Sequence, residues 1–348
     1  MCKIVDHALA SPAAWHGEKI ASSDEWIVQL NTDHLDEIQA ALDVTKHRDL
    51  ELLDVTVQDF PLPRLAGLVA DVQNELERGR GFTLIRGLHA DRFGKEEMTK
   101  AFWGLGNHIG WPEPQDRTGN LLHHVRNTGL EMGQHDNLRL YQTNKTIPFH
   151  NDGSDVFMLL CLQPAIRGGR SLLVSAVSVF NEIIRRCPDL AESLQQTIYF
   201  DARGQQAEGL PRYQAVPIFN VYEGRLHVLY KRDYIDLAQR FDEVPRLSER
   251  QVEALDLLDR ICHEDGFALE FDMQPGDILL ANNYQLLHSR TMFEDAIAEE
   301  RRRHLLRLWL TLPNGRELPP VFEHTREFCH SYARRKLPHP RTPGTTDQ

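Results

Sequence analysis

The sequence lacks the features that mark several large classes of protein. It has 5 cysteines among 348 residues, an odd number, and no two of them form a C-x-x-C pair. A disulfide framework or a zinc knuckle is therefore not expected. No apolar run approaches the roughly 18 residues of a membrane-spanning helix, and segment 1–26 has no apolar stretch typical of a secretion signal. These absences predict a cytoplasmic protein.

Positive charge is also scarce. Lys and Arg number 39 against 51 Asp and Glu, so the formal net charge is −12. This charge argues against nucleic acid or an anionic membrane as a partner. We expect a small-molecule substrate instead, and a local basic cluster could still bind an anionic one. The sequence is compatible with either a monomer or a homo-oligomer.

The distribution of apolar residues predicts a mainly β fold with flanking helices. Apolar residues recur at helical spacing over 61–81, whereas the run GFTLIRGL (81–88) is typical of a buried strand. Further along, short strand patterns dominate, interrupted by a helix over 248–263 that Ser248 and Gln251 open as a capping box. Because strands and helices do not alternate as in βαβ folds, we expect an antiparallel sandwich or barrel.

We expect one domain over 1–348, since no clear linker divides the chain. Its parts are a helix-rich N-terminal extension over 1–80, a β core over 81–312 and a C-terminal extension over 313–348. Within the core, the polar segment 112–140 is predicted to be a loop that could act as a lid. We expect its histidines to be solvated or structural; they are His123, His124 and His135.

A short polar motif, FHNDGSD (149–155), lies between two apolar runs. In an extended chain, residues i and i+2 point to the same side, so His150 and Asp152 would project together. A neutral imidazole and a carboxylate on one side suit a divalent metal of intermediate softness. The motif alone occurs by chance in many chains, and a solvated turn is the alternative interpretation.

His288 is the candidate for a third ligand among 17 histidines. It follows the turn signal at 275–277 and the strand pattern ILLANN. Two histidines and one aspartate would occupy one face of an iron ion and leave three positions for small molecules.

Two arginines downstream support this interpretation. In RRRHLLRLWL (301–310), strand alternation puts Arg303 and Arg307 on one face. Buried arginines need anions, and the planar guanidinium binds a carboxylate through two hydrogen bonds. Pairing with structural acids, or an exposed sheet edge, is the alternative. Ser171, which follows a tight turn at 168–169, could donate a hydrogen bond from its hydroxyl to a carboxylate.

The segments FHND, GGRS, PGDILLANNYQLLHSR and RHLLRLW occur in the order found in one known group of enzymes. Over roughly 80–312 the sequence resembles the taurine dioxygenase-like superfamily of Fe(II)/2-oxoglutarate oxygenases, which includes clavaminate synthase. The resemblance implies a double-stranded β-helix, a distorted, cupin-like jelly roll, as the core of a single catalytic domain. It also implies Fe(II) held by His150, Asp152 and His288, with 2-oxoglutarate and O₂ as cosubstrates.

The same resemblance implies roles for other residues. Arg303 matches the arginine that pairs with the distal carboxylate of 2-oxoglutarate, with Arg302 as the alternative. Ser171 stands where the family usually has a threonine that contacts this cosubstrate. Arg307 matches an arginine that faces substrate or cosubstrate. The expected reaction is hydroxylation, or another oxidation, of an unactivated C–H bond with release of succinate and CO₂, and Asp152 disfavours halogenation.

Substrate contacts are expected from Tyr141, Asn144, Asp155 and Arg307, which include the residues that flank the H-x-D motif. Arg307 indicates an anionic group such as a carboxylate, sulfonate or phosphonate, whereas Asp155 indicates an amine. We therefore expect a small polar, carboxylate-bearing metabolite. Two alternatives stay open: a non-catalytic jelly roll that binds a small ligand, and a cupin-type metalloenzyme that does not use 2-oxoglutarate.

Overall fold

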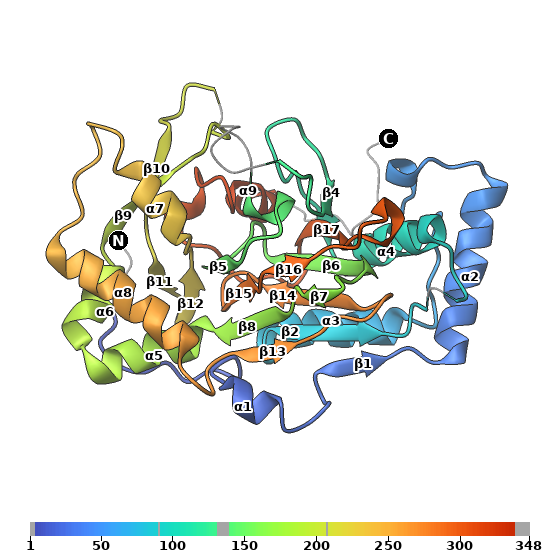
Figure 1. Cartoon of the computed structure of the whole chain (residues 1–348), viewed down its shortest axis with the longest axis horizontal. Coiled ribbons are helices and arrows are strands. Elements are labelled where there is room, and N and C mark those ends of the chain that lie inside the picture. Colours follow the sequence, from blue (N-terminus) through green and yellow to red (C-terminus); the bar gives the residue numbers. More distant parts are fainter. Residues whose placement is uncertain (1–3, 90, 131–138, 207, 338–348) are drawn as a thin grey trace.

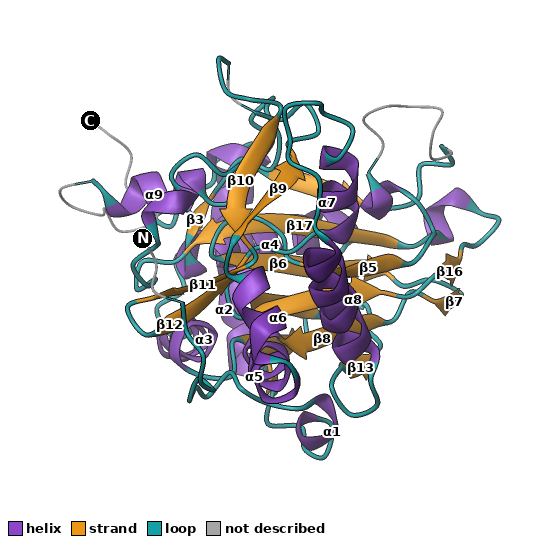
Figure 2. Cartoon of the chain, turned by 90° about the vertical axis from the view of Figure 1, so that its left-hand side faces the viewer, coloured by secondary structure: helices purple, strands orange, loops and turns teal. Residues whose placement is uncertain are grey.

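The computed structural model describes residues 4–89, 91–130, 139–206 and 208–337. The chain has a mainly β fold in which helices flank two facing sheets (Figures 1 and 2). Within the described part of the chain, no helix has the length and apolar character needed to cross a membrane. The predicted class, mainly β with flanking helices, is confirmed.

The larger sheet has seven strands. Its path runs β1 (Ile27–Gln29), β2 (Phe82–Arg86), β14 (Ile278–Asn282), β6 (Val156–Gln163), β17 (His304–Thr311) and β3 (Trp111–Pro112), and β4 (Leu122–Val125) also pairs with β17. All pairs are antiparallel except β1 with β2.

The smaller sheet has four antiparallel strands. They are, in order, β13 (Leu269–Phe271), β8 (Ser171–Ser175), β15 (Leu286–Arg290) and β5 (Ile147–His150). Three two-stranded ribbons complete the β structure: β9 (Thr197–Asp201) with β10 (Tyr213–Pro217), β11 (Phe219–Tyr222) with β12 (Arg225–Val228), and β7 (Arg167–Gly168) with β16 (Phe293–Glu294).

An apolar layer joins the inner faces of the two sheets. Leu305 and Trp309 of β17 belong to this layer, together with Leu173 of β8 and Leu286 of β15. The alternate residues of β17, such as Leu308, point to the opposite side, toward the helices that cover the larger sheet. The alternation predicted for this strand is therefore present, and Arg307 shares the inner face with Leu305 and Trp309.

Helices cover the outer face of each sheet. On the larger sheet these are α2 (Thr32–His47), α3 (Ala66–Arg78) and α4 (Lys95–Ile109). On the smaller sheet they are α5 (Ala176–Arg186), α6 (Pro188–Leu194) and α8 (Glu249–His263), which pack together in Figure 2. Three short helices complete the set: α1 (Gly17–Ile20), α7 (Arg232–Ala238) and α9 (Cys329–Arg335). The described residues also contain four 3₁₀ turns: η1 (Leu52–Asp54), η2 (Leu140–Gln142), η3 (Glu299–Arg301) and η4 (Pro320–Phe322).

Local signals account for several of these boundaries. Helix α3 ends at Arg78, with Gly79 as its C-cap, inside the range 61–81 over which helical spacing was predicted. The side chain of Ser248 caps α8 by accepting a hydrogen bond from the backbone of Gln251. Strand β8 stops at Ser175, although apolar residues continue to 177. The Ser175 side chain accepts a hydrogen bond from the backbone of Ser178 at 2.9 Å and so starts α5.

The prediction that 112–140 is entirely loop is wrong in part. Residues Leu122–Val125 form β4, which pairs with β17 from Leu305 to Leu308. The segment lacks the apolar alternation of a strand, and its partner strand supplies the pairing. The N-terminal extension contributes to the core, because its β1 adds a strand to the larger sheet. His135 lies outside the described residues.

Candidate active site

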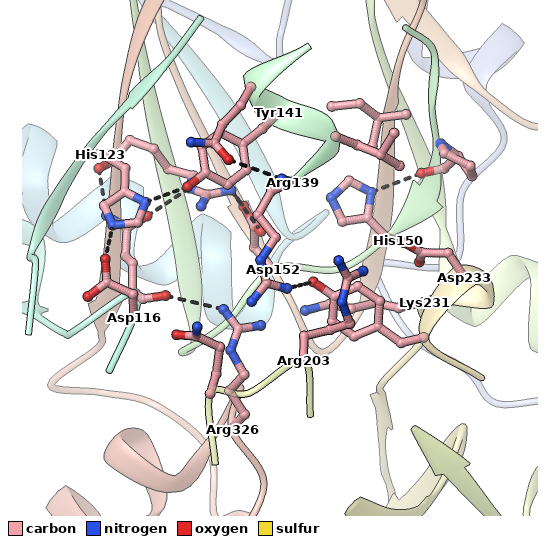
Figure 3. A pocket seen from close by; sticks show the side chains of 18 of the residues that line it. Asp116, His123, Arg139, Tyr141, His150, Asp152, Arg203, Lys231, Asp233 and Arg326 are labelled. Carbon is pink, nitrogen blue, oxygen red and sulfur yellow. Dashed lines mark hydrogen bonds and ion pairs between the residues drawn. The ribbon is translucent and has the colours of Figure 1, made fainter. Parts of the chain in front are cut away.

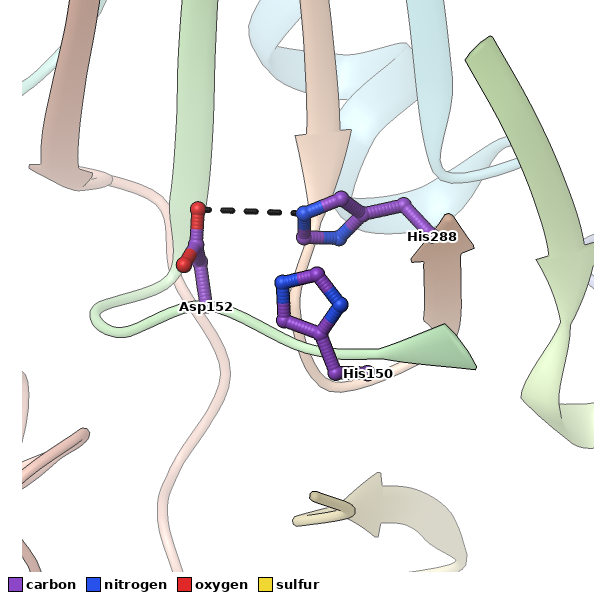
Figure 4. A group of neighbouring side chains, drawn as sticks. All are labelled: His150, Asp152 and His288. Carbon is purple, nitrogen blue, oxygen red and sulfur yellow. Dashed lines mark ion pairs between the residues drawn. The ribbon is translucent and has the colours of Figure 1, made fainter. Parts of the chain in front are cut away.

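His150, Asp152 and His288 form one cluster. One candidate ligand atom from each lies within 4.8 Å of the others, and Figure 4 shows the three side chains turned toward one another. His150 and His288 are direct cross-strand partners of β5 and β15, and their ring centroids are 4.1 Å apart. Pairing of these two strands therefore closes the long sequence separation between the histidines.

The turn that carries Asp152 is braced from the larger sheet. The Asn283 side chain accepts a hydrogen bond from the Asp152 backbone at 3.1 Å and donates one to the Gly153 carbonyl at 2.7 Å. Gly153 lies so close to the Trp309 ring that a Cβ atom there would be 2.4 Å from it. These contacts hold Asp152 on the same side as His150, which is the arrangement that the i, i+2 spacing predicts.

The electrostatics of the cluster leave its donor atoms ready for a cation. Burial opposes ionisation of Asp152, but Arg307 and the two imidazoles outweigh it and hold the pKa of this carboxyl well below its usual range. Burial lowers the pKa of both His150 and His288, so both rings are neutral at neutral pH. His150 uses Nδ1 to donate to the Pro148 carbonyl at 2.9 Å, which leaves Nε2 free as a ligand.

Arg307 contacts the cluster directly. Its Nη1 donates to both carboxylate oxygens of Asp152, at 3.0 and 2.9 Å, and its Nε donates to the side chain of Gln115 at 2.7 Å. Its guanidinium also lies over the rings of Tyr141 and Trp309. Arg307 thus lies beside the candidate metal ligands, where an anion in the site would meet it.

A small cavity of about 50 Å³ extends from the cluster between the two sheets. Ser171 and Arg303 line it, as does Arg290. Arg303 is only 5% exposed, and its Nη1 has no hydrogen-bond partner within the described residues. Arg302, in contrast, is exposed, and among the described residues its side chain donates hydrogen bonds to the backbone carbonyls of Ala296 and Ile297. Between the two neighbouring arginines, Arg303 is therefore the one inside the protein.

Arg290 is a site residue that the sequence reasoning missed. It is the direct cross-strand partner of Ser171. The guanidinium groups of Arg290 and Arg303 both lie over the Phe293 ring. Its Nε and Nη1 have no hydrogen-bond partner among the described residues, and burial, followed by Arg303, lowers its pKa to about 9. The available signal was the spacing H-S-R, because residues 288 and 290 share one face of a strand.

The predicted substrate residues separate into two groups. Tyr141 and Arg307 line the cavities beside the cluster, and the hydroxyl of Tyr141 bonds with His123. Asn144 is exposed and does not line them. Asp155 does not line them either.

Asp155 is fully buried. It accepts hydrogen bonds from the hydroxyl of Tyr284, the backbone of Leu312 and the guanidinium of Arg335. Because these three partners occupy its carboxylate, Asp155 has a structural role and not the predicted contact with a substrate amine.

A larger cavity of about 240 Å³ opens on the other side of the cluster (Figure 3). Its lining has more cationic than anionic side chains. The cations are Arg139, Arg203, Lys231, Arg232, Arg307 and Arg326, and the carboxylates are Asp116, Asp152 and Asp233. His123, which we expected to be solvated or structural, lines this cavity and bonds with Asp116 at 2.9 Å.

Comparison with known proteins identifies the family of this chain. The family model described as "Taurine catabolism dioxygenase TauD, TfdA family" matches residues 46–309. FR-33289 synthase of Streptomyces rubellomurinus is 28% identical over 324 residues, which cover 92% of this chain and 95% of that protein. The taurine hydroxylase-like protein SAT17 of Stachybotrys chartarum is 28% identical over 333 residues, with 90% and 85% covered. A uridine-5'-phosphate dioxygenase of Amycolatopsis sp. matches at 27% over 150 residues, with 43% and 53% covered.

Solved structures share the fold. An asparagine oxygenase in complex with Fe(II), hydroxyasparagine and succinate superposes with a TM-score of 0.61 at 16% identity, covering 83% of this chain and 94% of its own. The non-haem iron oxygenase OrfP, in complex with Fe and α-ketoglutaric acid, gives 0.57 at 18% identity, covering 82% and 94%. Since the family model matches more than half of the sequence, the chain belongs to the TauD/TfdA family of iron- and 2-oxoglutarate-dependent dioxygenases.

Proposed function

We propose that this dioxygenase hydroxylates an unactivated C–H bond of a small, carboxylate-bearing or otherwise anionic metabolite. Fe(II) would be held by His150, Asp152 and His288, and 2-oxoglutarate would serve as cosubstrate. The observation that carries the proposal is the convergence of these three side chains between two cavities. One cavity ends in Arg290 and Arg303, and each of these buried guanidinium groups has at least one nitrogen without a hydrogen-bond partner among the described residues. We assign the two facing sheets to a double-stranded β-helix within a single catalytic, cytoplasmic domain.

The donor set fits a ferrous ion. Two neutral imidazoles and one ionised carboxylate match the 2-His-1-carboxylate face that leaves positions open for small molecules. Asp152 has two oxygens, so it can bind a cation through one and keep its hydrogen bond from Arg307 through the other. Neighbouring cations keep this carboxyl ionised, so no proton has to leave it when a metal binds.

The small cavity fits the distal part of a dicarboxylate. Arg303 and Arg290 approach it from opposite sheets, and Ser171 adds a hydroxyl beside Arg290. Buried guanidinium nitrogens without partners are costly unless an anion binds them. A carboxylate at this position would satisfy both arginines, which supports Arg303 as its main partner and Arg290 as a second one.

When bound, iron and 2-oxoglutarate would activate O₂, which is the oxidant: one of its oxygen atoms would enter succinate as CO₂ leaves, and the other would be inserted into the substrate C–H bond. The chain positions these molecules. Arg303, Arg290 and Ser171 orient the cosubstrate, while Arg307 holds Asp152 and faces the substrate. The rings of Tyr141 and Trp309 lie against the Arg307 guanidinium and help to hold it beside Asp152.

An anionic substrate agrees with both the cavity and the relatives. The larger cavity has twice as many cationic as anionic side chains in its lining. The family description and one relative are named for taurine, a sulfonate, and another relative is named for uridine-5'-phosphate. These names describe other proteins, and the cationic lining is the feature of this chain that supports the same class.

The test is anaerobic addition of Fe(II) and 2-oxoglutarate to the protein, followed by O₂. We expect a visible charge-transfer band before O₂ is added and release of succinate afterwards. His288→Ala should lose the band. His124→Ala, which changes an imidazole that bonds with His304 and lies outside the cluster, should keep it. A silent spectrum in the unaltered protein would favour a ligand-binding module, and turnover without 2-oxoglutarate would favour a cupin-type enzyme.

A further inference from the structure

We propose that the substrate carries a tetrahedral oxyanion, a phosphonate or a phosphate monoester, and that Arg139, Lys231 and Arg326 form its binding subsite in the larger cavity. The inference rests on the proposed function, because it names the substrate class of that site. It is drawn from residues that the sequence motifs did not indicate.

Cations from separate segments gather around Tyr234. Nζ of Lys231 lies 5.2 Å from the centre of its ring, and the guanidinium carbons of Arg203 and Arg139 lie 5.5 and 5.7 Å from it. Arg139 also donates a hydrogen bond to the Tyr234 hydroxyl. Arg139 precedes η2 and Lys231 precedes α7, so the charges come from distant parts of the chain (Figure 3). Like charges repel, so this arrangement favours an anion between them.

Among the described residues, one carboxylate serves two of the three cations of the proposed subsite. Glu327 is fully buried and is shared by Lys231, at 2.7 Å, and Arg326, at 3.2 Å. Arg139 has no carboxylate partner within the described residues, and burial, followed by Arg326 and Arg203, lowers its pKa. A bound anion would remove part of this electrostatic cost. Since the chain as a whole carries a charge of −12, the attraction has to come from this local cluster.

The geometry favours a tetrahedral dianion over a carboxylate. One guanidinium fork satisfies a planar carboxylate through two parallel hydrogen bonds. Here Lys231 and Arg326 share one buried carboxylate, and Arg139 has none among the described residues. Two of the three positive charges are therefore left over, which matches a group with three outward oxygens and two negative charges. Asp233 also lines the cavity, so an amine is the competing ligand class. Asp116 is already bonded by Thr118, Asn120 and His123.

The subsite lies next to the proposed metal ligands. The backbone of Lys231 forms an isolated antiparallel bridge with His150. Both Lys231 and Arg326 interact electrostatically with Asp152. If these cations hold the oxyanion of the substrate, the carbon that reaches the cluster is only a few bonds away from that oxyanion. The oxidised carbon should therefore be close to phosphorus in the substrate.

The experiment uses the anaerobic protein loaded with Fe(II) and saturated with 2-oxoglutarate. Methylphosphonate, methyl phosphate, methanesulfonate, acetate and methylammonium are titrated into it by calorimetry. We expect the phosphonate and the phosphate ester to bind more tightly than the other three. Arg139→Gln should weaken their binding by about ten- to hundredfold, since a charge-assisted hydrogen bond is lost. Arg139→Lys should retain part of it.

Arg212→Gln is the matched control, because it also removes one positive charge but from an exposed side chain outside this cavity. An equal loss in Arg139→Gln and Arg212→Gln would overturn the subsite. So would tighter binding of acetate or methylammonium than of methylphosphonate in the unaltered protein, a comparison that stands even when a variant does not fold. Comparison of the affinity for methyl phosphate with that for methylphosphonate distinguishes a phosphate ester from a phosphonate as the substrate group. Failure of the charge-transfer band to form defeats the proposed function itself, whereas a normal band without phosphonate binding defeats only this inference.

Discussion

Replacement of Arg303 by methionine separates a cosubstrate-binding role from a structural one. Arg303 is 5% exposed, and its Nη1 has no hydrogen-bond partner within the described residues. Burial lowers its pKa to about 10, which shows that the protein alone holds this charge at a cost. Methionine keeps the apolar stem and removes the charge. The ligand-free variant should therefore be at least as stable as the unaltered protein.

The loss of cosubstrate affinity should be large. Breaking a buried, hydrogen-bonded charge pair costs about 3–5 kcal/mol, and each 1.4 kcal/mol is about tenfold in affinity. Because Ser171 and Arg290 stay in place, we expect the lower end, about a hundredfold weaker binding of 2-oxoglutarate. At a concentration of 100 Kd, the cosubstrate stabilises the unaltered protein by about 2.7 kcal/mol. The same concentration would equal the Kd of the variant and stabilise it by about 0.4 kcal/mol.

Calorimetric titration of 2-oxoglutarate into the Mn(II)-loaded protein measures the affinity, and urea denaturation with and without 2-oxoglutarate measures the stabilisation. Arg302→Met is the matched control, because this neighbouring arginine is exposed and donates hydrogen bonds to backbone carbonyls. It should change neither quantity. The reasoning is refuted if Arg303→Met binds 2-oxoglutarate as tightly as the unaltered protein. It is also refuted if the ligand-free variant loses more than about 2 kcal/mol of stability, which would indicate a structural role.

Three further predictions concern stability. Asp155→Asn weakens the bonds to Tyr284 and Arg335 and should lower the free energy of unfolding by about 3 kcal/mol in urea denaturation; unchanged stability with altered substrate choice would restore its substrate role. Burial opposes ionisation of Glu327, but neighbouring cations lower its pKa to about 2 from 4.5. The ionised Glu327 therefore contributes to the free energy of unfolding fully above the pKa of the unfolded state, and this contribution is lost as pH falls toward 2. In Glu327→Gln the free energy of unfolding should fall less steeply with acid, and a pH profile identical to that of the unaltered protein would contradict this. Gly153→Ala should displace the ring that its Cβ would meet at 2.4 Å and cost about 1–3 kcal/mol; unchanged tryptophan fluorescence and stability would argue against it.

The local spacing of residues was enough to predict that His150 and Asp152 project to one side, and to predict several boundaries. His150 and Asp152 are two residues apart, and strand geometry alone puts such residues on one side. The same rule predicts the inner face of β17, with Leu305 and Trp309 in the layer between the sheets. The capping box at Ser248 is also a local pattern, and the structure contains it. These predictions succeeded because backbone periodicity decides them within a few residues.

The family resemblance supplied what spacing could not. Nothing local distinguishes His288 from the other histidines, and its place beside His150 depends on the pairing of β5 with β15. The order of four motifs along the chain gave the family resemblance, which implied His288 as the third ligand. The structure brings the three side chains together.

Only the tertiary structure decided the remaining parts of the site. Arg290 becomes a cavity residue because its strand pairs with that of Ser171, and Asp155 becomes structural because Tyr284 and Arg335 reach it from distant segments. The gathering of cations around Tyr234 has no counterpart in any local pattern. The periodicity of a strand determines which side a residue faces, but what it meets there depends on contacts between segments far apart in the sequence, and those exist only once the sheets have packed together.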